Sequence, residues 1–392
     1  MFHDLRIQNF RLFEDLQING LSRINLLGGR NNSGKTTVLE AVFLLCGGGN
    51  PELVLRINAF RGLSQVQRSP AGLSSSCWKP LFARLDLHRP ISIGGRHDHG
   101  RLELTVALEP TNTFELTQRP AGDPSRQDQS MIGNLQGATG ATGATGPTSR
   151  EGQSMIANLQ EDAALRTSGE RSAPATLRLS CVQDGNKREE GRMRVTEQGT
   201  IEVKRPSSAL PFQGAFLSAR NGNLQEDAVR LGQLRTQKRG DLLTQALRII
   251  EPRLQSVEDS SASGLPMIWG DIGLPELVPL PAMGEGLSRV ARIVLAISGE
   301  RGGVVLVDEI ENGIHHSVMD KVWAVLAEAA QQFDTQILAT THSFECVAAA
   351  SRALGRDWSY HRLDRNEDGK FHHVRYAPDE VVSAVDHGLE VR

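Results

Sequence analysis

Glycine, lysine and threonine stand near the N-terminus at a spacing that suits phosphate binding. Residues 29–37 read Gly-Arg-Asn-Asn-Ser-Gly-Lys-Thr-Thr, the G-x-x-x-x-G-K-T pattern of a phosphate loop. The glycines let backbone N–H groups curl around phosphate oxygens, the lysine reaches the β- and γ-phosphates, and the first threonine offers a hydroxyl to Mg²⁺. The pattern predicts a site for ATP and Mg²⁺, with its lysine on an exposed loop. The expected ATP ligands are Gly29, Asn31, Asn32, Ser33, Gly34, Lys35, Thr36 and Thr37, of which Thr36 is also an expected metal ligand.

A pair of carboxylates far downstream could also do chemistry. Asp308 and Glu309 directly follow the apolar run 303–307. We expect Asp308 to hold Mg²⁺ through water, and Glu309 to polarise the water that attacks the γ-phosphate. A core strand that ends in a solvated acidic turn is the plain alternative. The phosphate loop in the same chain favours the catalytic interpretation.

These groups need strands and helices that hold them in place. Residues 24–27 form a short apolar run before the loop, and residues 38–45 carry apolar side chains around a helix after it. A helix that begins at the loop adds the positive end of its dipole to the phosphate site. The run 303–307 does not alternate, which is typical of a central strand covered on both faces, and functional groups gather at the carboxyl ends of such strands.

Two further motifs indicate the kind of ATPase. Residues 282–289 form a glycine-containing turn that opens an apolar helix over 290–297, and residues 336–340 form a buried strand followed by His342. A single histidine after a strand is usually structural. Because this one comes after the Asp-Glu strand, we expect it to be the switch histidine at the γ-phosphate. The order of the four motifs is that of an ABC-type ATPase, with Glu309 and His342 as catalytic residues.

The set of motifs resembles the RecF/SMC/OLD branch of ABC ATPases, specifically the standalone bacterial AAA-family ATPases related to the OLD ATPase domain. The resemblance covers residues 1–60 and 210–345. It implies an α/β fold: an ABC-type P-loop NTPase with a mixed sheet core, an antiparallel β subdomain and a short helical lobe. It also implies that Arg11, in an Asn-Phe-Arg element, lies near the nucleotide phosphates. In the signature turn and D-loop, the implied contacts to the ATP of a second chain come from Met283, Gly284, Glu285, Gly286 and Asn312.

The signature turn departs from the Leu-Ser-Gly-Gly-Gln form of transporters. Met283 and Glu285 stand where serine and glycine would be. The resemblance implies a homodimer or a higher homo-oligomer, in which two chains sandwich two ATP molecules. Residues 224–257 are predicted to be helices, and they are too few for the long arms of SMC proteins. A compact protein is therefore expected.

Between the two ends of the chain the pattern changes. Residues 77–118 and 177–203 alternate as antiparallel strands do, and we expect them to flank the nucleotide base. Between them residues 125–136 recur at 149–160 with nine of twelve positions identical, around four collagen-like triplets. Four triplets with one proline are too few for a triple helix, so we predict a duplicated, flexible surface loop. The expected units are an N-terminal ATPase lobe (1–118), a collagen-like insertion (119–175), the rest of the β subdomain (176–222), a helical lobe (223–262) and a C-terminal ATPase lobe (263–392).

Composition excludes several classes of protein. The net charge of −3 gives no bulk positive field, although DNA contact through local basic groups stays possible. The four cysteines are scattered without metal-binding spacing, which indicates a reducing cytoplasm and no zinc site. No apolar run approaches 18 residues and no secretion signal is present, so we expect a cytoplasmic protein without membrane contact.

Two classes of function then compete. The first is an ATP-hydrolysing dimeric switch. The second is a nucleotide-gated scaffold with slow turnover, in which a separate effector protein acts. Fifty residues follow His342, too few for the TOPRIM nuclease domain of OLD proteins, so no nuclease activity is expected of this chain. By analogy we predict the regulator of an anti-phage system with a separate effector, and the alternative is a RecF-like DNA-repair ATPase.

Overall fold

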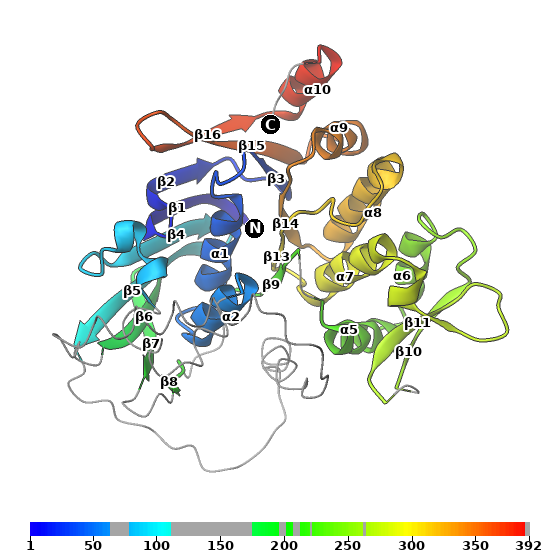
Figure 1. The fold of residues 1–392 in the computed structure, drawn as a ribbon, viewed down its shortest axis with the longest axis horizontal. Coiled ribbons are helices and arrows are strands. Elements are labelled where there is room, and N and C mark those ends of the chain that lie inside the picture. The colour runs from blue at the N-terminus through cyan, green and yellow to red at the C-terminus, as the bar shows by residue number, and fades with distance from the viewer. Residues whose placement is uncertain are drawn as a thin grey trace, which may run out of the picture.

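A six-stranded mixed sheet forms the centre of the molecule (Figure 1). The computed structural model describes residues 1–62, 78–110, 175–195, 201–206, 212–219, 222–261 and 264–388. Five strands of this sheet are parallel, and β16 at one edge is antiparallel. In spatial order the strands are β16 (Phe371–Tyr376), β15 (Trp358–Arg365), β3 (Ile24–Gly28), β14 (Gln336–Thr340), β13 (Val304–Val307) and β9 (Gly214–Leu217).

Helices cover both faces of this sheet, as the unalternating apolar strands predict. Val304 and Leu306 of β13 join one core cluster, whereas Val305 and Val307 join the other. Figure 1 shows α1 and α2 on one side of the strands and α7, α8 and α9 on the other. The first pair is α1 (Lys35–Cys46) and α2 (Glu52–Phe60), and the second group is α7 (Glu285–Gly299), α8 (Met319–Gln332) and α9 (Phe344–Ala353).

A seven-stranded antiparallel sheet packs against α1 on the side away from the central strands. Its spatial order is β2 (Phe13–Asn19), β1 (Phe2–Phe10), β4 (Ile91–His97), β5 (Gly100–Pro110), β6 (Ala175–Gln183), β7 (Asn186–Val195) and β8 (Ile201–Lys204). The antiparallel prediction is confirmed for β4 to β8, but it is wrong for residues 79–85, which form the two 3-10 helices η3 and η4 instead of strands. The predicted duplicated loop lies outside the described residues. Its two ends meet, because Pro110 and Ala175 are partners in the β5–β6 pair.

A smaller lobe combines two helices with a short sheet. The predicted helices are confirmed as α5 (Leu224–Thr236) and α6 (Asp241–Leu247). The helical prediction for Ser256 and Val257 is wrong, because both begin a strand whose buried Val257 sits between more exposed neighbours. That pattern is too short to distinguish a strand from a helix end. The sheet consists of β10 (Ser256–Ser260), β11 (Met267–Asp271) and β12 (Val278–Pro279).

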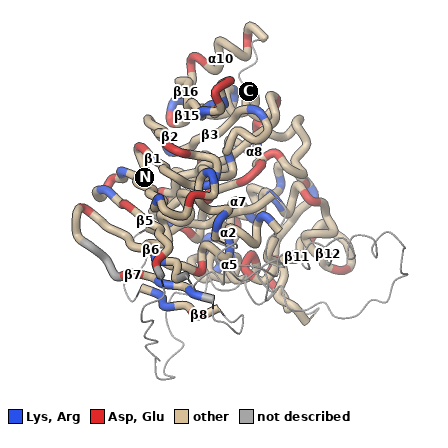
Figure 2. Tube along the Cα trace, turned by 60° about the vertical axis from the view of Figure 1, so that its left-hand side comes forward, with Lys and Arg blue, Asp and Glu red and all other residues tan. Residues whose placement is uncertain are grey.

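Charged residues of both signs are distributed along the described chain. Figure 2 shows acidic and basic residues interspersed over the described surface, as the small net charge predicts. Within the described ranges no helix is long and apolar enough to span a membrane. The remaining elements are η3 (Lys79–Leu81), η4 (Ala83–Leu85), η5 (Leu280–Met283), η6 (His316–Val318) and α10 (Pro378–Asp386).

Candidate nucleotide-binding site

The phosphate loop connects the carboxyl end of β3 to the first turn of α1. Three of its residues adopt left-handed backbone angles: Gly29 (φ 131°), Asn32 (φ 66°) and Gly34 (φ 89°). A Cβ atom at Gly29 would lie 2.2 Å from the carbonyl oxygen of Leu363, and one at Gly34 would lie 2.4 Å from the ring of Phe13. Both glycines are therefore required by close packing as well as by backbone conformation. The loop is held in shape by β15 on one side and the β1–β2 hairpin on the other.

Lys35 lies inside this loop and is only 4% exposed, so the prediction of an exposed lysine is wrong. Its Nζ donates hydrogen bonds to the carbonyl oxygens of Gly29 at 2.8 Å and Arg30 at 3.0 Å. Burial lowers the pKa of Lys35 to about 8, although nearby Asp308 acts in the opposite direction. The ammonium group of Lys35 thus lies inside the loop that is predicted to surround a phosphate group.

The two predicted metal ligands meet at the edge of the central sheet. Oγ1 of Thr36 donates to Oδ1 of Asp308 at 2.9 Å, and Oγ1 of Thr340 donates to the same oxygen at 2.8 Å. Thr340 was not predicted as a site residue. A hydroxyl and a carboxylate are hard oxygen ligands, which is the set that Mg²⁺ prefers when it keeps several waters. The residues present therefore fit Mg²⁺.

The two predicted catalytic side chains also lie together. Nε2 of His342 is 4.0 Å from Oε1 of Glu309, and the side chains are 38% and 45% exposed, respectively. Glu309 has a left-handed backbone (φ 49°), and its N–H donates to Oγ1 of Thr340 at 2.8 Å. The N–H of His342 donates to Oε1 of Glu311 at 2.7 Å. Backbone contacts between neighbouring strands thus bring an acid and a histidine to the same exposed edge.

The signature turn and the D-loop form a common surface. Gly284 (φ 126°) separates η5 from α7. A Cβ atom at Gly286 would lie 2.5 Å from the carbonyl oxygen of Gly313, so this close approach requires glycine. Nδ2 of Asn312 donates to the carbonyl oxygen of Ala219 at 3.2 Å. The surface also carries Met283, which is half-buried, and Glu285, which is exposed.

Arg289, outside the predicted set, connects this surface to the carboxylates. It is 4% exposed, and its guanidinium donates to the carbonyl oxygens of Ser218 (2.9 Å), Asp308 and Glu309 (3.4 Å). Burial lowers its pKa to about 10, so the group stays charged at neutral pH. A basic residue one turn after the start of a signature helix is the sequence signal that could have identified it.

Arg11 contacts helix α1 in this structure. Its Nε is 2.7 Å from Oε2 of the fully buried Glu40. Arg61, a second residue outside the predicted set, pairs with Oε1 of Glu40 at 2.7 Å and donates to Oγ1 of Thr37 at 3.2 Å. The two arginines therefore hold the helix that carries Thr36 and Thr37. A direct contact between Arg11 and nucleotide phosphates stays a prediction.

The fold and this geometry define an α/β P-loop NTPase. The strand-loop-helix unit, the mixed central sheet and the antiparallel sheet confirm the predicted fold class. Residues 4–70, which contain the phosphate loop, match a family model described as "AAA domain". Residues 208–347, which contain the signature turn and the carboxylates, match one described as "AAA domain, putative AbiEii toxin, Type IV TA system". The two segments that carry the site are thus each similar to an AAA domain.

Similar proteins are also found along the whole chain. A Helicobacter pylori protein named "ATP/GTP phosphatase" is 22% identical over 371 residues, which cover 90% of this chain and 88% of that protein. The SMC head domain from Thermotoga maritima is 10% identical with a TM-score of 0.38, and covers 96% of this chain and 98% of its own. A ScpA-bound Smc head domain derived from Pyrococcus furiosus is 10% identical with a TM-score of 0.43, and covers 98% of each chain. The fold class is defined by strand order and the phosphate loop, independently of these scores.

Proposed function

We propose that this chain is an ATPase that acts as a nucleotide-driven dimeric switch. One observation carries the proposal: the hydroxyls of Thr36 and Thr340 converge on one oxygen of Asp308, and Glu309 is the next residue. This arrangement joins the phosphate loop to the Asp-Glu strand across two neighbouring strands. The match to AAA-domain models at both ends of the chain supports ATP as the ligand.

Each residue of the site has a separate role in the proposed hydrolysis. Bound Mg²⁺, held by Thr36 and Asp308, would neutralise charge on the phosphates. Lys35 exchanges its two carbonyl partners for phosphate oxygens and holds the β- and γ-phosphates. Glu309 accepts a proton from the attacking water, since its carboxylate is partly exposed beside the metal ligands. His342, 4.0 Å from that carboxylate, is placed to hydrogen-bond the γ-phosphate.

The second copy completes the site. Helices α1 and α7 cover opposite faces of the central sheet, so the signature turn does not cover the phosphate loop of its own chain. In a two-fold sandwich the turn at Met283–Gly286, together with Asn312, would face the ATP of the partner. Hydrolysis would then open the dimer. We further propose that the switch regulates a separate effector protein, which the description of the matched toxin–antitoxin family supports.

The experiment that tests this function is the substitution Glu309→Gln. It removes the proton acceptor but keeps the metal ligand Asp308, so hydrolysis should fall about a hundredfold or more while ATP still binds. Size-exclusion chromatography with light scattering should show an ATP-dependent dimer that is longer-lived than that of the parent. Glu328→Gln on the exposed face of α8 makes the same chemical change away from the site and should leave turnover unchanged. Hydrolysis by Glu309→Gln at the parental rate would disprove the catalytic role.

A further inference from the structure

A basic hollow lies beside the phosphate loop. It encloses about 350 Å³ between the loop and the carboxyl end of β15. The packing of Gly29 against the carbonyl oxygen of Leu363 fixes the loop relative to this strand. The hollow is therefore a built feature of the nucleotide-binding edge. Its lining residues are Arg30, Asn31, Asn32, Ser33, Arg362, Asp364 and Arg365.

Two positive charges in this hollow have no counter-ion in the described part of the chain. Arg362 is neutralised by Asp364, at 2.7 Å between Nε and Oδ2. Arg30 is exposed and makes no ion pair with any described residue. Arg365 likewise has no acidic partner there, although Nε donates to the carbonyl oxygen of Gly369 at 3.2 Å and its guanidinium lies 5.6 Å from the ring centre of Phe371. Arg365 is thus held in position with its charge uncompensated.

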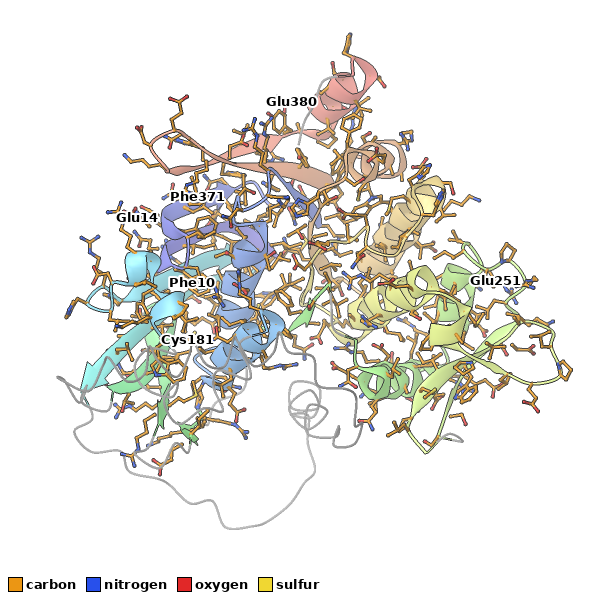
Figure 3. All side chains as sticks on the ribbon, in the orientation of Figure 1. Phe10, Glu14, Cys181, Glu251, Phe371 and Glu380 are labelled. Atoms are coloured by element: carbon orange, nitrogen blue, oxygen red, sulfur yellow. The ribbon has the colours of Figure 1, made fainter. Side chains whose placement is uncertain are left out.

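The aromatic ring under Arg365 is itself packed against the β1–β2 hairpin. Phe371 stacks edge-on against the buried Phe13 of the β1–β2 hairpin, with ring centres 5.0 Å apart. Figure 3 shows Phe371 beside this hairpin and close to Glu14. The same Phe13 ring packs on Gly34 of the phosphate loop. A ligand that pairs with Arg365 would therefore be connected by direct packing to the nucleotide loop.

The signature turn carries a matching negative charge. Glu285 is exposed in the first turn of α7 and has no ion pair among the described residues. Its Cγ would lie 2.8 Å from a Cβ atom at Gly313, so the side chain rests on the D-loop. In the proposed sandwich this carboxylate approaches a triphosphate on the partner chain. Like charges at such short range repel strongly unless a cation stands between them.

We propose that Glu285 of each copy enters the basic hollow of the other copy and pairs with Arg365, assisted by Arg30. This inference rests on the ATP sandwich of the proposed function. It identifies the ion pair between the two copies that stabilises the dimer. Two such pairs form in a symmetric dimer, one at each ATP. These two ion pairs explain why the signature turn carries a carboxylate while arginines lie beside the phosphate loop. Salt above physiological strength weakens the contact, because the pair lies at a partly solvated interface.

Charge reversal in the Glu309→Gln protein tests the pairing. Arg365→Glu and Glu285→Arg should each weaken the ATP-dependent dimer about tenfold or more, measured by analytical ultracentrifugation with ATP and Mg²⁺. An equimolar mixture of the two variants should dimerise nearly as well as the parent, because each mixed dimer contains one native pair and one reversed pair. Arg356→Glu, at an exposed position two residues before the amino end of β15, is the matched control and should dimerise normally.

The outcomes separate this inference from the function on which it rests. If the Glu309→Gln parent forms no dimer with ATP, the sandwich itself is wrong and the inference falls with it. If the parent dimerises and either single reversal does too, or if the mixture stays as weak as its components, only the pairing is wrong. Binding of a fluorescent ATP analogue to monomeric Arg365→Glu should match the parent. Loss of that binding would show that the hollow holds nucleotide of its own chain, and would also overturn the pairing.

Discussion

Single residues at the site are more constrained than their sequence pattern suggests. Lys35 is buried within its own loop, and its Nζ donates hydrogen bonds to two carbonyl oxygens of that loop. Burial of an ammonium group favours its neutral form, and this explains why its pKa falls to about 8. The charge of Lys35 therefore depends on the groups that surround its ammonium nitrogen.

We predict that ATP binding takes up a proton at alkaline pH. Free Lys35 loses its proton above pH 8, whereas Lys35 beside phosphate keeps it, so affinity should fall by up to about tenfold per pH unit above that value. Calorimetry at pH 8.5 in buffers of different ionisation enthalpy measures the proton uptake directly. At pH 7 the uptake should disappear. Lys35→Arg removes the titrating group, and uptake that persists in this variant would contradict the assignment.

At the scale of elements, helix α7 connects the signature turn to the strand that ends just before Asp308 and Glu309. Its first turn carries the signature surface, and Arg289 one turn later contacts the backbone of Asp308 and Glu309. The left-handed backbone of Glu309 (φ 49°) needs such support, because this conformation is unfavourable for residues other than glycine. If a partner chain displaced α7, the buried side chain of Arg289 would therefore move with the helix and shift the backbone of Glu309.

We predict that Arg289→Lys lowers kcat about ten- to a hundredfold and changes KM little. A lysine keeps the charge but carries its donors on a single nitrogen, whereas Arg289 reaches Ser218 with one guanidinium nitrogen and Asp308 and Glu309 with the other. Glu309 therefore loses its fixed position while the phosphate loop is untouched. Steady-state kinetics and melting temperature measure the two effects separately. Arg292→Lys on the same helix is the control, because Arg292 pairs with Asp227 and not with the carboxylate strand. A rise in KM with normal kcat would contradict a positioning role.

The β15–β16 hairpin contains a buried histidine pair. Nδ1 of His361 is 2.8 Å from Nε2 of His373, and Nε2 of His361 is 2.7 Å from Oγ of Ser359. The pKa of His361 is lowered to about 3 and that of His373 to about 4, mainly by burial and to a smaller extent by nearby positive charge, including Arg375. His361 is fully buried and His373 is half-buried, and with these lowered pKa values both rings are neutral in the folded protein at physiological pH.

We predict that the free energy of unfolding decreases as the pH falls from 7 to 5. Unfolded histidines take up protons below about pH 6.5 whereas the buried pair does not, so acid favours the unfolded chain. His361 alone accounts for about 2 kcal/mol at pH 5. Urea titrations at the two pH values measure the loss, which should be smaller in His361→Gln. His372→Gln, at an exposed position of β16, should show the parental loss, and an equal loss in both variants would contradict the prediction.

At the scale of the whole molecule, helix α1 lies between the central sheet and the antiparallel sheet. The smaller lobe, which contains α5, α6 and the sheet β10–β12, lies next to the signature turn. The antiparallel sheet and the central sheet contribute to one apolar cluster around α1. Helices α5 and α6 pack with α7 in the other cluster. If the smaller lobe moves relative to the phosphate loop when ATP binds, the elements that connect the two are therefore α7 and the central sheet.

We predict that removal of residues 125–160 leaves ATPase activity and stability nearly unchanged. The ends of the connection already meet at the Pro110–Ala175 partners, so the deletion does not stretch any strand. Shortening the 64-residue connection between these partners to 28 residues changes the entropic cost of loop closure by only about 0.7 kcal/mol. Turnover and melting temperature check the prediction. A decrease of several degrees would show that the duplicated segment packs on the core.

The sequence by itself determined the parts of this protein that depend on neighbours along the chain. The loop at 29–37 follows from glycine and lysine spacing, and the burial of 304–307 on both faces follows from an apolar run without alternation. Strand-loop-helix order then placed Asp308 and His342 at one edge, because the carboxyl ends of parallel strands meet there. None of these inferences needs a contact between distant side chains.

Tertiary structure decided the contacts that join residues far apart in the chain. Thr36 and Asp308 are 272 positions apart, and the convergence of Thr340 on the same oxygen depends on how β14 and β13 pair. The basic hollow likewise needs the end of β15 beside the phosphate loop. The burial of Lys35 and the reach of Arg289 to the carboxylate strand depend on rotamers chosen by packing. Local sequence patterns specify backbone elements, whereas only packing selects which side chains of those elements meet.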